Sequence, residues 1–115
     1  MKIVRADLED PHHQTSLMAM VEAFSAYPFG ANRPLPEPTR VGLIDGLREH
    51  PTTLLFLAFE DEAPIGMVVC FRAFSTFAAR PVINIHDIYV NEKARGRGVS
   101  RALLAAVEVE ARSLG

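Results

Sequence analysis

The sequence has a single cysteine, Cys70, among its 115 residues. One cysteine cannot form a disulfide within the chain, and it cannot supply a zinc ribbon or a CxxC redox pair. We therefore expect a cytoplasmic protein. Because Cys70 stands in an apolar stretch with strand character, we expect a buried small side chain and not a reactive thiolate.

Long hydrophobic segments are also missing. The longest near-continuous apolar runs, residues 54–59 and 65–71, fall far short of the roughly 20 residues that a membrane-spanning helix needs. The N-terminus places only two apolar residues between Lys2 and Arg5, so it lacks a secretory hydrophobic region. We expect no membrane partner.

Neither sign of charge dominates the chain. Twelve lysines and arginines stand against fourteen acidic residues, giving a net charge of -2, whereas nucleic-acid binding normally needs a broad basic surface. We expect no nucleic-acid partner. Hydrophobic residues make up 49% of the sequence, which is enough for one core at this length, so residues 1–115 are expected to form a single domain.

The spacing of apolar residues predicts an α/β protein. Leu17, Val21 and Phe24 recur at helical spacing, and Asp10 followed by Pro11 suits a helix start. Two β-rich runs around a polar turn at 60–64 predict an antiparallel hairpin. The predicted order is strand, helix, helix, strand, strand, strand, helix, at residues 1–6, 11–26, 38–49, 53–60, 65–73, 82–90 and 99–114. This order favours a sandwich with a mixed, mainly antiparallel sheet.

The most informative segment, residues 85–100, runs from a strand through a glycine-bearing turn into a helix. The first N–H groups of such a helix are unpaired, and the positive end of the helix dipole lies behind them, so they suit a phosphate or pyrophosphate. Gly96 and Gly98 let the backbone approach the phosphate, and its charge can be neutralised by Arg95, Arg97 and Arg101. Neither the P-loop pattern nor the dinucleotide fingerprint is present. The alternative is a capped helix start with a basic surface.

The run Arg-Gly-Arg-Gly-Val-Ser at 95–100, preceded by Ile-Tyr-Val and followed closely by Ala-Leu-Leu, resembles the acetyl-CoA signature of the GNAT superfamily of N-acetyltransferases. The family pattern is [QR]-x-x-G-x-[GA]. Arg95 and Gly98 match its first two fixed positions, whereas Ser100 stands where glycine or alanine is usual. The predicted element order is also that of the first half of the family fold. The resemblance therefore implies a GNAT-like three-layer α/β/α architecture, in the order β-α-α-β-β-β-α.

The resemblance also implies which residues bind acetyl-CoA. Backbone N–H groups of about residues 97–101 would hold the pyrophosphate, and the backbone of Ile88 and Val90 would pair with the pantetheine arm as another strand would. An amide near Tyr89 or Val90 would polarise the thioester carbonyl. The expected coenzyme-binding residues are Ile88, Tyr89, Val90, Arg95, Gly96, Arg97, Gly98, Val99, Ser100 and Arg101.

Direct acetyl transfer needs a base, because an amine must lose a proton to act as a nucleophile. Imidazole is the side chain that exchanges a proton near neutral pH, which makes His86 the catalytic candidate. Strand alternation predicts that His86 shares a face with Asn84, Ile88 and Val90. In the arylalkylamine branch of the family a histidine precedes a leucine or isoleucine by two residues, as His86 precedes Ile88. The alternative is a strand histidine with no catalytic role.

Acceptor contacts are expected in two places. The resemblance puts the acceptor site under the proline-rich loop at 27–38, which nominates Tyr27, Phe29, Asn32 and Arg33; the alternative is a plain surface loop. Asp87 is expected to face the other side from His86 and to contact the substrate or orient a neighbour. We expect no metal site, since the adjacent His12 and His13 do not share a helix face and lack further ligands nearby.

The family fold continues beyond its third helix with further strands and a helix, whereas this sequence stops at Leu114 and Gly115. The sequence therefore predicts a C-terminally truncated domain in which those C-terminal strands are absent. The outer edge of the fourth strand would be unpaired, and we expect a second copy to cover it in a homodimer.

Three functions are compatible with these patterns. The first is an N-acetyltransferase that moves acetyl from acetyl-CoA to a primary amine of a small molecule by direct attack in a ternary complex. The second is a catalytically inactive coenzyme A-binding or assembly module. The third is an unrelated α/β domain with an anion-binding helix start.

Overall fold

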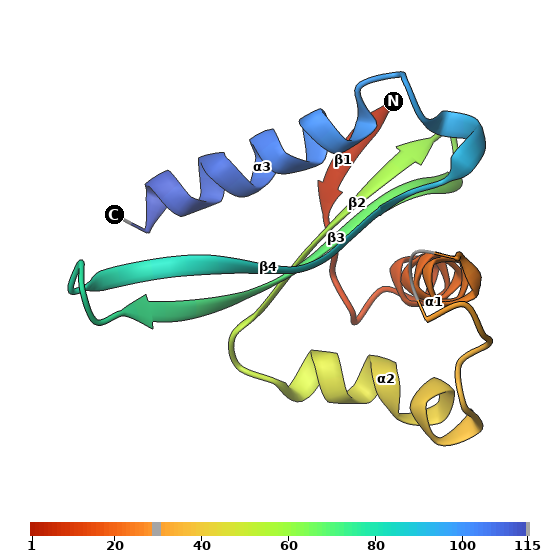
Figure 1. The fold of residues 1–115 in the computed structure, drawn as a ribbon, viewed down its shortest axis with the longest axis horizontal. Helices are drawn as coiled ribbons and strands as arrows, with labels where there is room; N and C mark the ends of the chain where they lie inside the picture. The colour runs from red at the N-terminus through yellow and green to blue at the C-terminus, as the bar shows by residue number, and fades with distance from the viewer. Residues whose placement is uncertain (29–30, 115) are drawn as a thin grey trace.

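The computed structural model describes residues 1–28 and 31–114. Its sheet has the order β1-β2-β3-β4, and every pairing between these strands is antiparallel (Figure 1). The strands are β1 (Lys2–Arg5), β2 (Thr53–Glu60), β3 (Ala63–Ser75) and β4 (Arg80–Val90). The predicted strands are confirmed, although β3 and β4 extend further than the apolar pattern indicated.

Helices cover both faces of the sheet, which confirms the three-layer α/β/α architecture (Figure 1). The helices α1 (Pro11–Ala26) and α2 (Glu37–Glu49) cover one face, and α3 (Val99–Ser113) covers the other. A short 3-10 helix, η1 (Glu92–Ala94), joins β4 to the turn before α3. Among the helices of the described segments, none is both long and apolar enough to cross a membrane.

The sheet contributes side chains to two separate cores. From β2, Leu55, Leu57 and Phe59 pack toward α1, where Leu17 and Met20 are buried. The alternate residues of β2 pack toward α3, against Val99, Leu103 and Val107. Burial on both faces explains why β2 reads as an almost unbroken apolar run and not as an alternating one.

A bulge interrupts the alternation of β4. Val69 of β3 pairs with Asp87, but Cys70 pairs with Ile85, so His86 is an extra residue in β4. The His86 ring lies against Phe71, with ring centroids 5.5 Å apart, and Phe71 packs on the α1 side of the sheet. Ile88 and Val90 pack on the α3 side.

Two predictions about this strand are therefore wrong. His86 does not share a face with Ile88 and Val90, although it does share one with Asn84, which pairs with Phe71. Asp87 does not face away from His86, because it pairs with Val69 of the α1-side core. The physical reason is the extra residue, which shifts the alternation of β4 by one position. Such a bulge depends on how two strands pair, so the sequence of one strand does not reveal it.

Candidate active site

A pocket of about 650 Å³ opens across the outer edge of β4, next to the start of α3 and the end of α1. Tyr89 packs on the α1 side of the sheet, and Ile88 and Val90 pack on the α3 side, so the pocket spans the strand edge. The lining residues are Phe24, Tyr27, Ile88, Tyr89, Val90, Arg95, Gly96, Gly98, Val99, Ser100 and Arg101. The structure thus brings together every expected coenzyme residue except Arg97.

Two glycines shape the turn that forms one wall of this pocket. Gly96 and Gly98 have φ angles of 80° and 78°, in the left-handed region that side-chain-bearing residues rarely adopt. A Cβ at either position would meet nothing within 4 Å, so both glycines are needed for conformation and not for space. Gly98 is the N-cap of α3 and offers no side-chain acceptor, which leaves the first N–H groups of the helix available to a ligand.

The segment before the turn is fixed to the body of the protein. The backbone N–H of Asn91 donates to the Ile65 carbonyl at 2.8 Å, and the Asn91 side chain accepts from the Lys93 N–H. Ala94 is buried in the α3-side core. These contacts hold η1 while residues 95–98 remain exposed.

The three arginines expected to neutralise phosphate have different surroundings. Arg95 donates from Nε to the Val90 carbonyl at 3.0 Å and from Nη1 to the Tyr27 hydroxyl at 2.5 Å. The bond to Tyr27 raises the pKa of the Arg95 guanidinium above its ordinary value. Arg97 pairs with the Glu60 carboxylate outside the pocket. Arg101 lines the pocket, and no described residue forms an ion pair with it.

His86 lies outside the pocket, on the α1 side of β4. Its side chain is 65% exposed, and its Nε2 is 3.8 Å from Asp87 Oδ2. Phe71 contacts a second imidazole, since the His50 ring also meets it edge-on at 5.4 Å. His86 and Asp87 are therefore placed together, but not with the coenzyme residues.

The expected acceptor residues divide in a similar way. Tyr27 lines the pocket, with its ring 6.1 Å from that of Tyr89. Asn32 and Arg33 are exposed and do not line it, and Phe29 lies outside the described residues. Phe24 also lines the pocket, which the sequence did not indicate, and its ring lies 5.7 Å from that of Tyr89. Its position three residues before Tyr27 on an amphipathic helix was the available signal.

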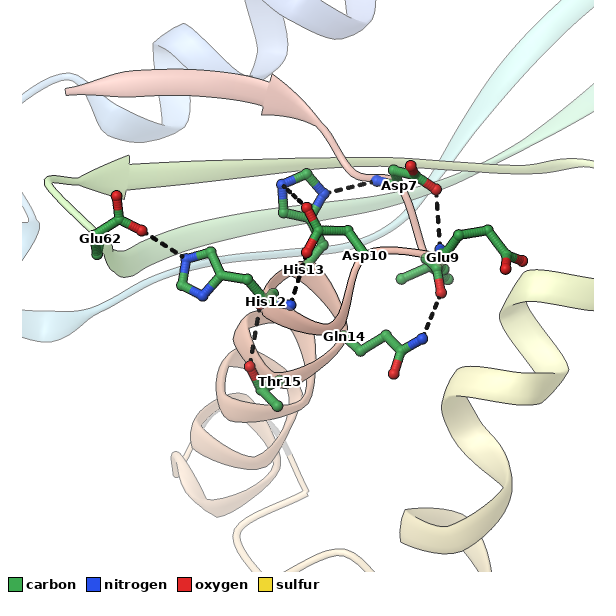
Figure 2. Close-up of polar contacts among 9 residues, drawn as sticks. Asp7, Glu9, Asp10, His12, His13, Gln14, Thr15 and Glu62 are labelled. Carbon is green, nitrogen blue, oxygen red and sulfur yellow. Dashed lines mark hydrogen bonds and ion pairs between the residues drawn. The ribbon is translucent and has the colours of Figure 1, made fainter.

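The histidine pair at the start of α1 forms a separate cluster (Figure 2). Both rings stack on Phe59, at 5.3 Å for His12 and 6.0 Å for His13, so these adjacent side chains meet a common neighbour, against the expectation that they do not share a helix face. The Asp7 N–H donates to Nδ1 of His13, and His12 approaches Glu62. Within residues 1–28 and 31–114, no three side chains of His, Cys, Asp or Glu are arranged to hold a metal ion.

Solved acetyltransferase structures resemble this chain over nearly its whole length. A probable acetyltransferase is 29% identical with a TM-score of 0.81, covering 99% of this chain and 73% of its own. A ribosomal-protein-alanine N-acetyltransferase from Brucella melitensis biovar Abortus 2308 is 17% identical with a TM-score of 0.74, covering 98% and 72%. An aminoglycoside antibiotic 6'-N-acetyltransferase from Acinetobacter haemolyticus is 21% identical with a TM-score of 0.75, also covering 98% and 72%.

A comparison with curated proteins found no match. The model of the acetyltransferase (GNAT) family matches residues 17–115, which include both sides of the pocket described above. The chain therefore belongs to the GNAT family and is an acetyltransferase.

Proposed function

We propose that this acetyltransferase moves the acetyl group of acetyl-CoA to a primary amine of a small molecule, by direct attack in a ternary complex. The observation that carries the proposal is the pocket that joins the outer edge of β4 to the start of α3, whose N-cap Gly98 offers no side-chain acceptor. The similar fold of an aminoglycoside antibiotic 6'-N-acetyltransferase supports a small molecule as the acceptor.

The residues of the pocket fit the coenzyme. The N–H groups of about residues 97–101 would hold the pyrophosphate, and Arg101 would add a positive charge beside it. The outer edge of β4 has no strand partner among the described residues, so the backbone of Ile88 and Val90 can pair with an extended arm. When bound, acetyl-CoA supplies the thioester carbonyl that accepts the amine.

His86 is the proposed base. It would take the proton that the acceptor nitrogen loses as the new C–N bond forms and the C–S bond breaks. Its exposed ring lies on the side of the sheet that α1 and α2 cover, against Phe71. Asp87, 3.8 Å from the His86 ring, would orient the imidazole or contact the ammonium form of the acceptor.

The coenzyme site is tested by calorimetry with acetyl-CoA on the whole chain. We expect wild-type binding and its loss in Gly98→Glu, which would place a carboxylate in the expected pyrophosphate position. Gly98→Ala adds the same backbone strain without charge and is expected to bind more weakly than wild type but more tightly than Gly98→Glu. Gly42→Glu, on an open face of α2, is the control. Equal binding by wild type and Gly98→Glu would contradict the site.

The role of His86 is tested by rate and binding together. Removing a general base typically costs about 10²- to 10⁴-fold in rate. We expect His86→Ala to lose acetyl transfer to amines by such a factor, while its acetyl-CoA affinity stays unchanged, because His86 does not line the pocket. Full activity in His86→Ala would contradict a catalytic role for His86. His12→Ala, at the remote cluster, controls for loss of an exposed imidazole.

A second function has one observation in its favour. Because His86 lies outside the pocket, a coenzyme A-binding or assembly module without catalysis is also compatible with the geometry. Thiol release from acetyl-CoA, measured across a panel of primary amines, separates the two. Coenzyme binding without amine-dependent release would favour the module.

A cytoplasmic location remains a prediction.

A further inference from the structure

Arg95 occupies the first fixed position of the coenzyme-binding signature, yet its side chain is bound to the protein itself. The guanidinium donates to the Val90 carbonyl and to the Tyr27 hydroxyl. It also lies 4.4 Å from the ring centre of Tyr27 and 5.8 Å from that of Tyr89. A guanidinium held by two acceptors and two aromatic rings is fixed in orientation, and its Nε and Nη1 donors are already used within the protein.

Tyr27 provides a rigid attachment point. It caps the C-terminus of α1, where its backbone N–H donates to the Phe24 carbonyl at 3.1 Å. Its ring meets Tyr89 edge-on, and Tyr89 is buried in the α1-side core. The Tyr27 hydroxyl is therefore placed by a helix end and by a buried ring.

The coenzyme turn has few other anchors at this point. Residues 95–98 are exposed, and the turn's two glycines have open space around the positions where a Cβ would stand. Arg97 binds Glu60 and so ties the turn toward the hairpin of β2 and β3. Toward α1, the contact between Arg95 and Tyr27 links the turn to the end of the helix within the described residues, although 68 positions separate the two in the sequence.

We infer that Tyr27 and Arg95 form a positioning pair that fixes the coenzyme turn against the end of α1. Tyr27 then contributes to acetyl-CoA affinity through Arg95, and Arg95 acts on the placement of the turn's N–H groups instead of pairing with phosphate. The inference rests on the proposed coenzyme site. The pair also links the loop expected to contact the acceptor with the coenzyme turn. Beyond Tyr27 the loop is joined back to α1, because the Ser25 hydroxyl donates to the Arg33 carbonyl and the Arg33 N–H donates to the Ser25 carbonyl.

A double-mutant cycle on acetyl-CoA affinity tests the pair. Tyr27→Phe removes one hydrogen bond and should raise the Kd about three- to tenfold, the usual effect at a partly exposed site. Arg95→Met removes that bond and the bond to the Val90 carbonyl, so its Kd should rise at least as much. The double variant should bind about as well as Arg95→Met alone, because the pair is already broken. Additive losses, or no loss in Tyr27→Phe, would overturn the inference. Arg112→Met, an exposed arginine on α3, is the matched control.

Arg95→Lys separates positioning from charge. Lysine keeps the positive charge but lacks the planar fork, so we expect it to bind acetyl-CoA as poorly as Arg95→Met. Wild-type affinity in Arg95→Lys would identify a phosphate-neutralising role and overturn the inference.

Hydrogen exchange of the ligand-free protein gives an independent readout. The amides of Ala94, Arg95 and Ala102, which are hydrogen-bonded on either side of the turn, should exchange faster in Tyr27→Phe and Arg95→Met than in wild type, with no change in the core strands. If wild-type protein fails to bind acetyl-CoA, the proposed function fails while this measurement still decides the pair. Unchanged exchange in both variants would overturn the inference.

Discussion

Cys70 has its side chain fully enclosed between β3 and α3. Burial raises the pKa of its thiol from 9.0 to about 11, so at pH 8 the folded protein keeps the thiol protonated. We expect Ellman's reagent to modify native protein at pH 8 far more slowly than protein unfolded in urea. Equal rates would contradict the burial of this side chain.

The same residue predicts a pH dependence of stability. An unfolded thiol ionises near pH 9, while the folded one stays protonated until about pH 11. Its contribution to the free energy of unfolding is therefore complete below pH 9 and is lost as the pH rises toward 11. The free energy of unfolding, measured with urea between pH 8 and 11, should fall more steeply with pH for wild type than for Cys70→Ala. Parallel curves would show that other groups cause the decline.

At the level of single residues, the sequence indicated the pocket better than the partners within it. The glycines and the start of α3 could be recognised because their conformational needs are local. The contact between Arg95 and Tyr27 could not, because it joins chain segments that only the folded sheet brings together. The placement of His86 was missed for the same reason.

Among the elements, α3 packs closely against β3 at Gly66. A Cβ on Gly66 would stand 3.0 Å from Val99 Cγ1 and 3.2 Å from Leu103 Cδ1. We expect Gly66→Ala to lower the free energy of unfolding by about 1–3 kcal/mol, as overpacking usually does. Urea denaturation measures the change.

Gly42→Ala is the matched control for this substitution. Gly42 lies inside α2 with nothing within 4 Å of its would-be Cβ. Alanine there should raise the free energy of unfolding by about 0.5–1 kcal/mol, because a helical glycine loses more chain entropy on folding. A stabilising effect at both positions would mean that α3 packs less closely than described.

The predicted bounds of helices and strands agree closely with the structure where capping residues, prolines or turn residues mark the ends. Asp10 and Pro11 marked the start of α1, and the predicted range 53–60 coincides with β2. The extra residues of β3 and β4 beyond 73 and before 82 were missed because they pair with each other in a hairpin arm with little apolar alternation. The 3-10 helix η1 was read as part of a turn, since its three residues carry no periodic signal.

For the whole molecule, the expected homodimer remains a prediction. Within the described part of the chain β4 pairs on one side only, and Ile85 on β4 and Phe74 on the neighbouring β3 are exposed. Pairing of two β4 edges over residues 80–86, away from the coenzyme-binding part of the strand, would cover such residues. Analytical ultracentrifugation should give twice the chain mass of 12.7 kDa for wild type and the single mass for Ile85→Lys. A wild-type monomer at high concentration would contradict the prediction.

The strand order also constrains how the molecule assembles. β2, β3 and β4 follow one another in the chain as they do in the sheet, so they can pair through short turns as soon as they exist. β1 is made first but must wait for β2, with both α1 and α2 emerging in between. Closing that long loop is the costly step entropically. During synthesis β1 therefore spends an interval unpaired. Of the two apolar faces of β2, the one that meets α1 can be covered first, because α1 is made before β2 and α3 after it.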